Sequence, residues 1–227
     1  MARAPAPRRT FHQELVLHRW LLGFFKERTL AALKARLGDD RHEGIDEDGQ
    51  TRFFHELTRN LFEVDRISEA DLRRFDLNIV RHWQAITERR NRNGAQLEMK
   101  YFQYLSLLLT EIYLDFYFSR RQALINGLNE ELKTYRAEQG AEAFRGYDAD
   151  DLNKVAFWNA TGSGKTLLLH VNIRQYLEYF SGGKPDVRPD KIILLTPNCQ
   201  SALNSFQVTA PKSFQLIRPV STAFCVV

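Results

Sequence analysis

The chain has 227 residues, a hydrophobic share of 44%, a charged share of 26% and a formal net charge of +4. These values are those of an ordinary globular protein, so disorder is not the expected state. The slight positive charge fits a nucleic-acid partner without requiring one. Two cysteines, Cys199 and Cys225, are too few for a disulfide framework and favour a cytoplasmic location.

The N-terminal part of the chain is predicted to be helical. Residues 1–10 are rich in Pro, Ala and Arg with no apolar stretch behind them, which argues against a secretory signal and predicts a disordered basic arm. Residues 11–146 form the predicted helical region. Within it we expect one helix from Phe11 to Leu37, ended by Gly38, and a shorter amphipathic helix from Phe53 to Val64.

The segment after Ser68 carries the strongest helical pattern. Ser68-Glu69-Ala70-Asp71 resembles the start of a capped helix, in which a Ser side chain accepts a hydrogen bond from a first-turn N–H. Apolar residues then recur at steps of three and four and predict one buried face: Leu72, Phe75, Ile79, Trp83 and Ile86. The opposite face carries arginines that either bind phosphate groups or are simply solvated: Arg73, Arg74, Arg81, Arg89 and Arg90.

A long helical stretch is predicted over residues 97–138, which Asn126-Gly127 could interrupt. Its first part, Tyr101–Phe118, is strongly apolar, but Glu111 and Asp115 interrupt the run. Carboxylates near the centre of a bilayer cost several kcal/mol. The pattern therefore predicts a buried helix in a soluble domain, and no membrane span.

The pattern changes near Tyr147. The run Lys154–Trp158 is short and apolar, as is typical of a buried parallel strand. A glycine-containing loop, a helix from Lys165 to about Phe180 and a second strand at Ile192–Thr196 follow it. The predicted fold class is therefore α/β: a helical N-terminal region followed by an incomplete P-loop (RecA-like) βαβ unit, with residues 147–198 as the start of the motor domain.

The loop between the predicted strand and helix carries the chemistry. The P-loop pattern is G-x-x-x-x-G-K-[ST]; Gly164, Lys165 and Thr166 match it, whereas Asn159 stands at the first glycine position. Glycines let consecutive backbone N–H groups point at an anion, and the following helix directs its positive end there. Lys165 would supply charge to the β- and γ-phosphates, and Thr166 a hydroxyl ligand to Mg²⁺. The predicted site for ATP and Mg²⁺ comprises Ala160, Thr161, Gly162, Ser163, Gly164, Lys165 and Thr166.

Two stretches resemble motifs I and Ia of superfamily 2 DEAD/DEAH-box helicases: FWNATGSGKTLLLHVNI and KIILLTPN. They are most similar to bacterial proteins like the translocase (restriction) subunit of type III restriction enzymes. The helical region before motif I in such proteins resembles KYFQYLSLLLTEIYLDFYF. The resemblance implies a nucleic-acid-dependent ATPase, with DNA favoured over RNA as the partner and a methylase-type subunit in the parent system. It also implies that Thr196, Pro197 and Asn198 lie near a nucleic-acid backbone; a strand end and turn is the alternative.

Three features depart from that family. No Asp or Glu follows Asp190, so the acidic DExx-type motif is missing, and so is the second motor domain. The adenine-reading glutamine normally lies a few tens of residues before motif I, whereas Gln103 lies about 60 before it, and the spacing argues against it. The acid-free residues 199–227 are either a strand-rich tail or, as we favour, the product of a changed reading frame after Asn198. We therefore expect a truncated fragment that binds nucleotide weakly and hydrolyses little of it, so whether it is an enzyme stays open.

Two other classes of function remain as alternatives. Another P-loop ATPase or a kinase would use the same loop for nucleotide. A non-enzymatic helical interaction module with a vestigial P-loop would bind none. The six histidines show no metal-ligand spacing, so the only metal that the sequence predicts is the Mg²⁺ of the nucleotide.

Overall fold

The computed structural model describes residues 15–63, 65–94, 96–139, 144–157, 159–182, 192–195 and 214–217. Its α-helices are α1 (Val16–Leu22), α2 (Leu30–Leu37), α3 (Arg52–Glu56), α4 (Glu69–Arg92), α5 (Tyr101–Ser119), α6 (Arg121–Gln139) and α7 (Lys165–Ser181). Single turns of other helix types are η2 (Asp40–His42), η3 (Leu57–Leu61) and η4 (Asp151–Asn153), and the strands are β1 (Ile192–Leu195) and β2 (Phe214–Ile217). From residue 15 to 182, the named elements in the described part are therefore all helical.

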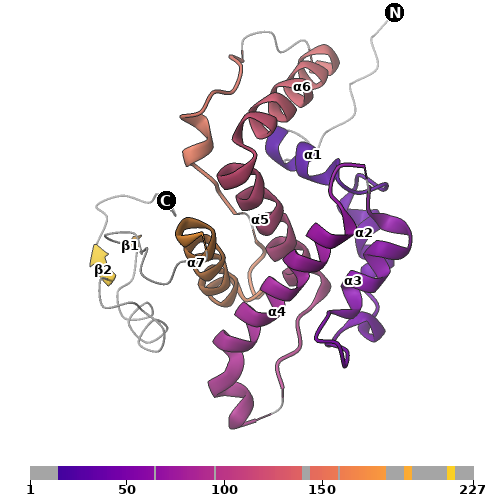
Figure 1. Ribbon diagram of the computed structural model, residues 1–227, viewed down its shortest axis with the longest axis vertical. Helices are drawn as coiled ribbons and strands as arrows, with labels where there is room; N and C mark the ends of the chain where they lie inside the picture. Colours follow the sequence, from indigo (N-terminus) through magenta and orange to yellow (C-terminus); the bar gives the residue numbers. More distant parts are fainter. Residues whose placement is uncertain are drawn as a thin grey trace, which may run out of the picture.

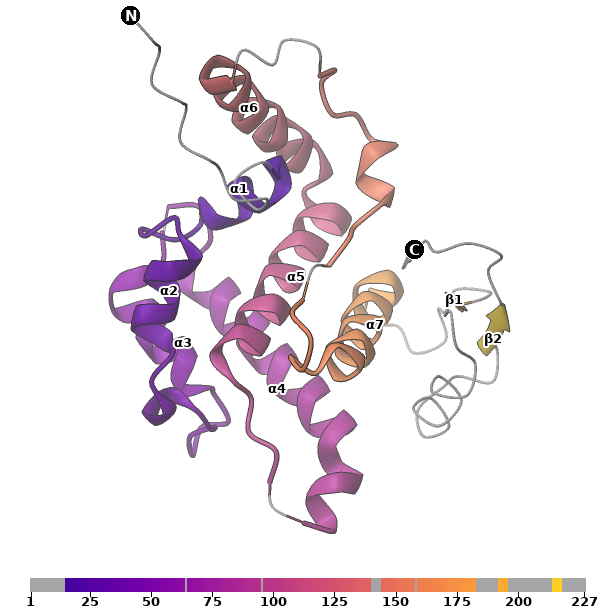
Figure 2. The same cartoon turned by 180° about the vertical axis from the view of Figure 1, so that it is seen from behind.

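Helix α5 lies at the centre of the helical assembly (Figure 1), with α1–α3 on one side and α7 on the other; Figure 2 shows the same order from behind. Aromatic contacts join it to the N-terminal helices: Trp20 meets Phe116 edge to face at 5.2 Å, and Phe53 stacks on Tyr104 at 5.0 Å. The apolar run of α5 is thus a buried helix, as predicted. No helix in the described part of the chain is long and apolar enough to cross a membrane.

Helix α4 confirms the prediction made from its sequence. Ser68 Oγ accepts a hydrogen bond from Asp71 N at 3.1 Å, which satisfies one of the first-turn N–H groups. The apolar positions Leu72, Phe75, Ile79 and Trp83 are buried, and Ile86 packs against the same core. The helical period of the apolar residues and the Ser68 cap were sufficient to predict α4, because both signals come from residues close together in the sequence.

Two predicted helices have different boundaries in the structure. Within the predicted helix Phe11–Leu37, the described residues 15–37 form two helices. Phe24 and Phe25 between them are both buried, and both pair with the segment after α3: Glu63 N–H donates to Phe24 O, and Phe25 bridges to Phe62. Lys26 N–H donates to Leu61 O at 2.9 Å, which replaces the helical bond at that point. The predicted helical stretch of residues 97–138 is interrupted at Arg120, between α5 and α6. The predicted break near Gly127 is absent, because Gly127 lies inside α6. Residues 11–14 lie outside the described residues.

The predicted α/β fold class is wrong for the described structure, which is all-helical around the loop. Residues 154–157 form no strand; Ala156 and Phe157 are exposed to solvent, and Trp158 lies outside the described residues. Among the described residues, strand β1 pairs in parallel with β2, with Ile192 opposite Phe214, and residues 154–157 contribute no strand to that sheet. A parallel strand requires neighbours that pair its backbone. The chain before the loop is instead an extended connection, held on α5 where Tyr113 OH donates to Leu152 O at 2.6 Å.

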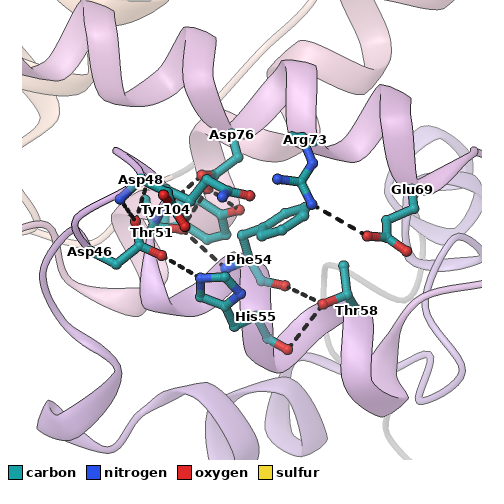
Figure 3. Close-up of polar contacts among 11 residues, drawn as sticks. Asp46, Asp48, Thr51, Phe54, His55, Thr58, Glu69, Arg73, Asp76 and Tyr104 are labelled. Carbon is teal, nitrogen blue, oxygen red and sulfur yellow. Dashed lines mark hydrogen bonds and ion pairs between the residues drawn. The ribbon is translucent and has the colours of Figure 1, made fainter.

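A buried carboxylate fixes the positions of α3, α4 and α5. Asp76 of α4 is 0% exposed, and Figure 3 shows it directed at Thr51 and Tyr104. Thr51 N–H donates to Asp76 Oδ2 at 2.8 Å, and Tyr104 OH donates to Asp76 Oδ1 at 2.8 Å. Burial raises the pKa of Asp76, and these hydrogen bonds oppose that shift. Buried polar groups that find their partners in this way restrict how the helices can pack.

Candidate nucleotide-binding loop

The predicted site residues 160–166 lie together, where an extended segment turns into α7. Gly162 and Gly164 both have a φ of +82°, a left-handed conformation that glycine adopts without steric cost. Ser163 N–H donates to Ala160 O at 3.2 Å and closes the turn, and Leu168 N–H donates to Gly164 O at 3.0 Å at the start of α7. The two glycines therefore allow the chain to enter the helix directly from the loop.

The start of α7 is suited to an anion. The first N–H groups of a helix have no partner within it, and the aligned peptide dipoles place partial positive charge there. Gly164 is the N-cap of α7, and because glycine has no side chain, it leaves these N–H groups without a side-chain cap. Because α7 has 17 residues, its dipole is fully developed at the loop.

The polar side chains of the loop differ in their exposure and in their hydrogen-bond partners. Ser163 is only 8% exposed, and its Oγ has no hydrogen-bond partner among the described residues. Lys165 Nζ lies 3.4 Å from Asn159 O and 3.5 Å from Ala160 O, so the ammonium group rests over carbonyl groups of the loop itself. The Thr166 side chain is exposed to solvent. These are the side chains that the sequence predicts at a site for a nucleotide and Mg²⁺.

Gln103 contacts the loop, although its distance in sequence had argued against a role there. Its Nε2 donates to Ser163 O at 3.0 Å, and its Oε1 accepts from Lys100 N at 3.0 Å. One donor and one acceptor on opposite sides define the orientation of the amide. Both amide atoms are thus engaged, and Gln103 ties the loop to the first turn of α5. A glutamine at the third position of a helix is a capping signal, but only the fold shows what else it reaches.

Helix α7, which begins at the loop, packs against α4 and α5. Leu168 and Val171 of α7 are buried in the common core with α4 and α5. Glu178 of α7 forms an ion pair with Arg81 of α4, and His82 Nε2 of α4 lies 2.8 Å from Glu178 Oε2. Hydrogen bonding to His82, followed by that to Arg81, lowers the pKa of Glu178 to about 2. The position of α7 is therefore set by both apolar packing and ion pairs.

The arginine face of α4 is largely neutralised by carboxylates. Arg73 lies 3.6 Å from Glu69, and Arg74 lies 2.8 Å from Asp115 and 3.0 Å from Asp71. Arginines in such pairs offer less charge to a phosphate backbone than free ones. The exposed arginines near the end of the helix, Arg89 and Arg90, remain candidates for such contacts.

The second predicted contact region, Thr196, Pro197 and Asn198, lies outside the described residues, as do residues 1–14. Within the described part of the chain, no group of three His, Cys, Asp or Glu side chains could hold a metal ion.

Comparison of the chain with known proteins identified no relative. A scan against protein-family models gave no match, and searches of curated proteins and of solved structures each returned no significant match. The function must therefore be argued from the loop, its surroundings and the motif resemblance.

Proposed function

We propose that the chain binds Mg-ATP through Ala160–Thr166 and is the nucleotide-binding part of a nucleic-acid-dependent ATPase of the helicase type. The observation that carries this proposal is the TGSGKT loop, with both glycines left-handed directly before a helix of 17 residues. The resemblance to translocase subunits of type III restriction enzymes supports the same function, with DNA as the partner and a cytoplasmic location.

The groups of the loop have distinct tasks in this proposal. Backbone N–H groups at the start of α7 bind the β-phosphate, and Lys165 balances charge on the β- and γ-phosphates. Thr166 donates a hydroxyl ligand to Mg²⁺, and the ion neutralises charge on the phosphate oxygens when bound. Gln103 keeps the loop against α5. We expect hydrolysis close to background, because no Asp or Glu after Asp190 can assist the ion or activate water.

Calorimetric titration with Mg-ATP tests the nucleotide site. Lys165→Ala should lose most of the affinity, at least about tenfold, because it removes the full positive charge of the loop. Lys154→Ala is the matched control, since Lys154 is also exposed but lies upstream of the loop. Equal affinity in the wild type and Lys165→Ala would remove the proposal. A phosphate-release assay with DNA tests the expected low turnover, and strong stimulation by DNA would contradict it.

A second candidate is a non-enzymatic helical interaction module. It is favoured by the all-helical structure around the loop, where residues 154–157 provide no strand. This candidate predicts no binding of Mg-ATP at all, so the same titration separates the two. A kinase or another P-loop ATPase would also bind nucleotide. The kinase would require a phosphate acceptor other than water, and the ATPase would require acidic residues of its own.

A further inference from the structure

A buried carboxylate in the interface between α5 and α7 receives its hydrogen bonds from neutral groups. Glu111 of α5 is 0% exposed. Its Oε1 accepts from Gln175 Nε2 at 2.8 Å, and its Oε2 accepts from Tyr179 OH at 2.9 Å. Asn78 Nδ2 of α4 donates to Oε2 at the longer distance of 3.4 Å. Both short hydrogen bonds come from α7, from residues one helical turn apart, so Glu111 contacts that helix at two points.

The charged groups around Glu111 are paired with one another. They are Asp115 with Arg74 and Arg120, and Glu178 with Arg81 and His82. Arg74 also reaches Tyr179 OH, at 3.4 Å. Because these arginines face other carboxylates, the hydrogen bonds that Glu111 receives come from neutral groups. Desolvation outweighs them and raises the pKa of Glu111 to about 7.

The contacts of Glu111 continue along α5 to the loop. Gln175 Nε2 also donates to Leu107 O at 3.1 Å, one turn before Glu111. Two turns before Glu111, Gln103 holds Ser163. Since α7 is continuous from Lys165 to Ser181, its far half and the loop move as one body, with Gln175 about 15 Å from the helix start. The polar face of α5 therefore contacts the loop and the helix behind it at separate points.

We propose that Glu111 is a positioning residue, which holds α7 and with it the Ala160–Thr166 loop against α5 through Gln175 and Tyr179. The proposal rests on nucleotide binding at the loop. A carboxylate in the middle of α5 thereby affects phosphate binding at the loop, which it does not contact. When Glu111 loses its acceptor atoms, one N–H of the buried Gln175 and the O–H of the half-buried Tyr179 lose this partner, and the docked position of α7 is disfavoured.

The test compares three variants of the full chain by hydrogen–deuterium exchange and Mg-ATP titration. Glu111→Leu removes the acceptors, whereas Glu111→Gln keeps one and resembles the protonated acid. Asp76→Asn is the matched control, because Asp76 is an equally buried carboxylate of α4 that bonds to Thr51 and Tyr104 and not to α7. Glu111→Leu should raise exchange in α7 and in the loop and weaken Mg-ATP binding at least about tenfold. Asp76→Asn should raise exchange around Thr51 and α3, without the selective increase in α7 and the loop that Glu111→Leu produces.

The pH profile separates positioning from general damage to the fold. Docking of α7 buries Glu111 and favours its protonated form, so wild-type affinity should fall relative to Glu111→Gln as the pH rises through about 7. A constant ratio across this range would overturn the proposal, as would normal exchange of α7 in Glu111→Leu. If the wild type binds no Mg-ATP, the proposed function fails; faster exchange confined to α7 and the loop would then still support the positioning role.

Discussion

Replacing Glu111 by Gln should remove much of the change in stability that the wild type shows between pH 4.5 and about 8. Burial raises the pKa of Glu111 from its ordinary value of 4.5 to about 7. At about 1.4 kcal/mol per pKa unit, this difference corresponds to roughly 3 kcal/mol in the free energy of unfolding. The folded state binds the proton more tightly, so this stabilisation is complete below pH 4.5 and is lost as the pH rises through 7.

Urea denaturation at a series of pH values measures this effect. The free energy of unfolding of the wild type should fall by about 3 kcal/mol relative to Glu111→Gln between the two ends of the range. The control is Glu130→Gln, an exposed Glu of α6 whose pair with Lys133 contributes little to stability. It should follow the wild-type curve. Parallel curves for the wild type and Glu111→Gln would refute the argument that burial of this carboxylate dominates its hydrogen bonds.

Three other predictions follow from particular contacts. Gly164→Ala should weaken Mg-ATP binding, because its φ is +82° and a Cβ would lie 2.9 Å from Gln103 Nε2. Its control is Gly182→Ala, at φ +56° with no described atom within 4 Å of a Cβ, which should cost about 1–2 kcal/mol of stability in urea denaturation and leave the affinity unchanged. Gly127→Ala should lower the stability measured by urea denaturation by about 1–3 kcal/mol, although Ala favours helix, because its Cβ would overlap Trp20 Nε1. DNA binding in gel shifts should be weak and fall steeply with salt, since the net charge is only +4; binding that does not change with salt would contradict this.

Local signals predicted the parts of the fold that depend on neighbouring residues. Ser68 and the apolar period behind it identified α4, because a cap and a buried face are properties of one helix. The break at Arg120 and the continuity of α6 through Gly127 were not predictable in this way. The indole of Trp20 packs where a side chain at position 127 would lie, and that contact joins α1 to α6 across about a hundred residues.

The predicted strand at Lys154–Trp158 failed for a related reason. A short apolar run can pack as a strand or as an extended connection, and only its hydrogen-bonding neighbours decide which. In the described structure Tyr113 holds this segment at Leu152, and β1 pairs with β2 instead. The periodicity of a few residues contains no information about which distant segment lies beside them.

The sequence by itself determined the loop: glycines at 162 and 164, Lys165 and Thr166 need no partner far along the chain to form a left-handed glycine turn before a helix. The tertiary structure decided what holds that loop. Gln103 reaches Ser163 from 60 residues away, and Glu111 meets Gln175 across 64. Such contacts depend on how α5 and α7 pack, because the free energy of burying a polar group is set by its neighbours in space and not by those in sequence.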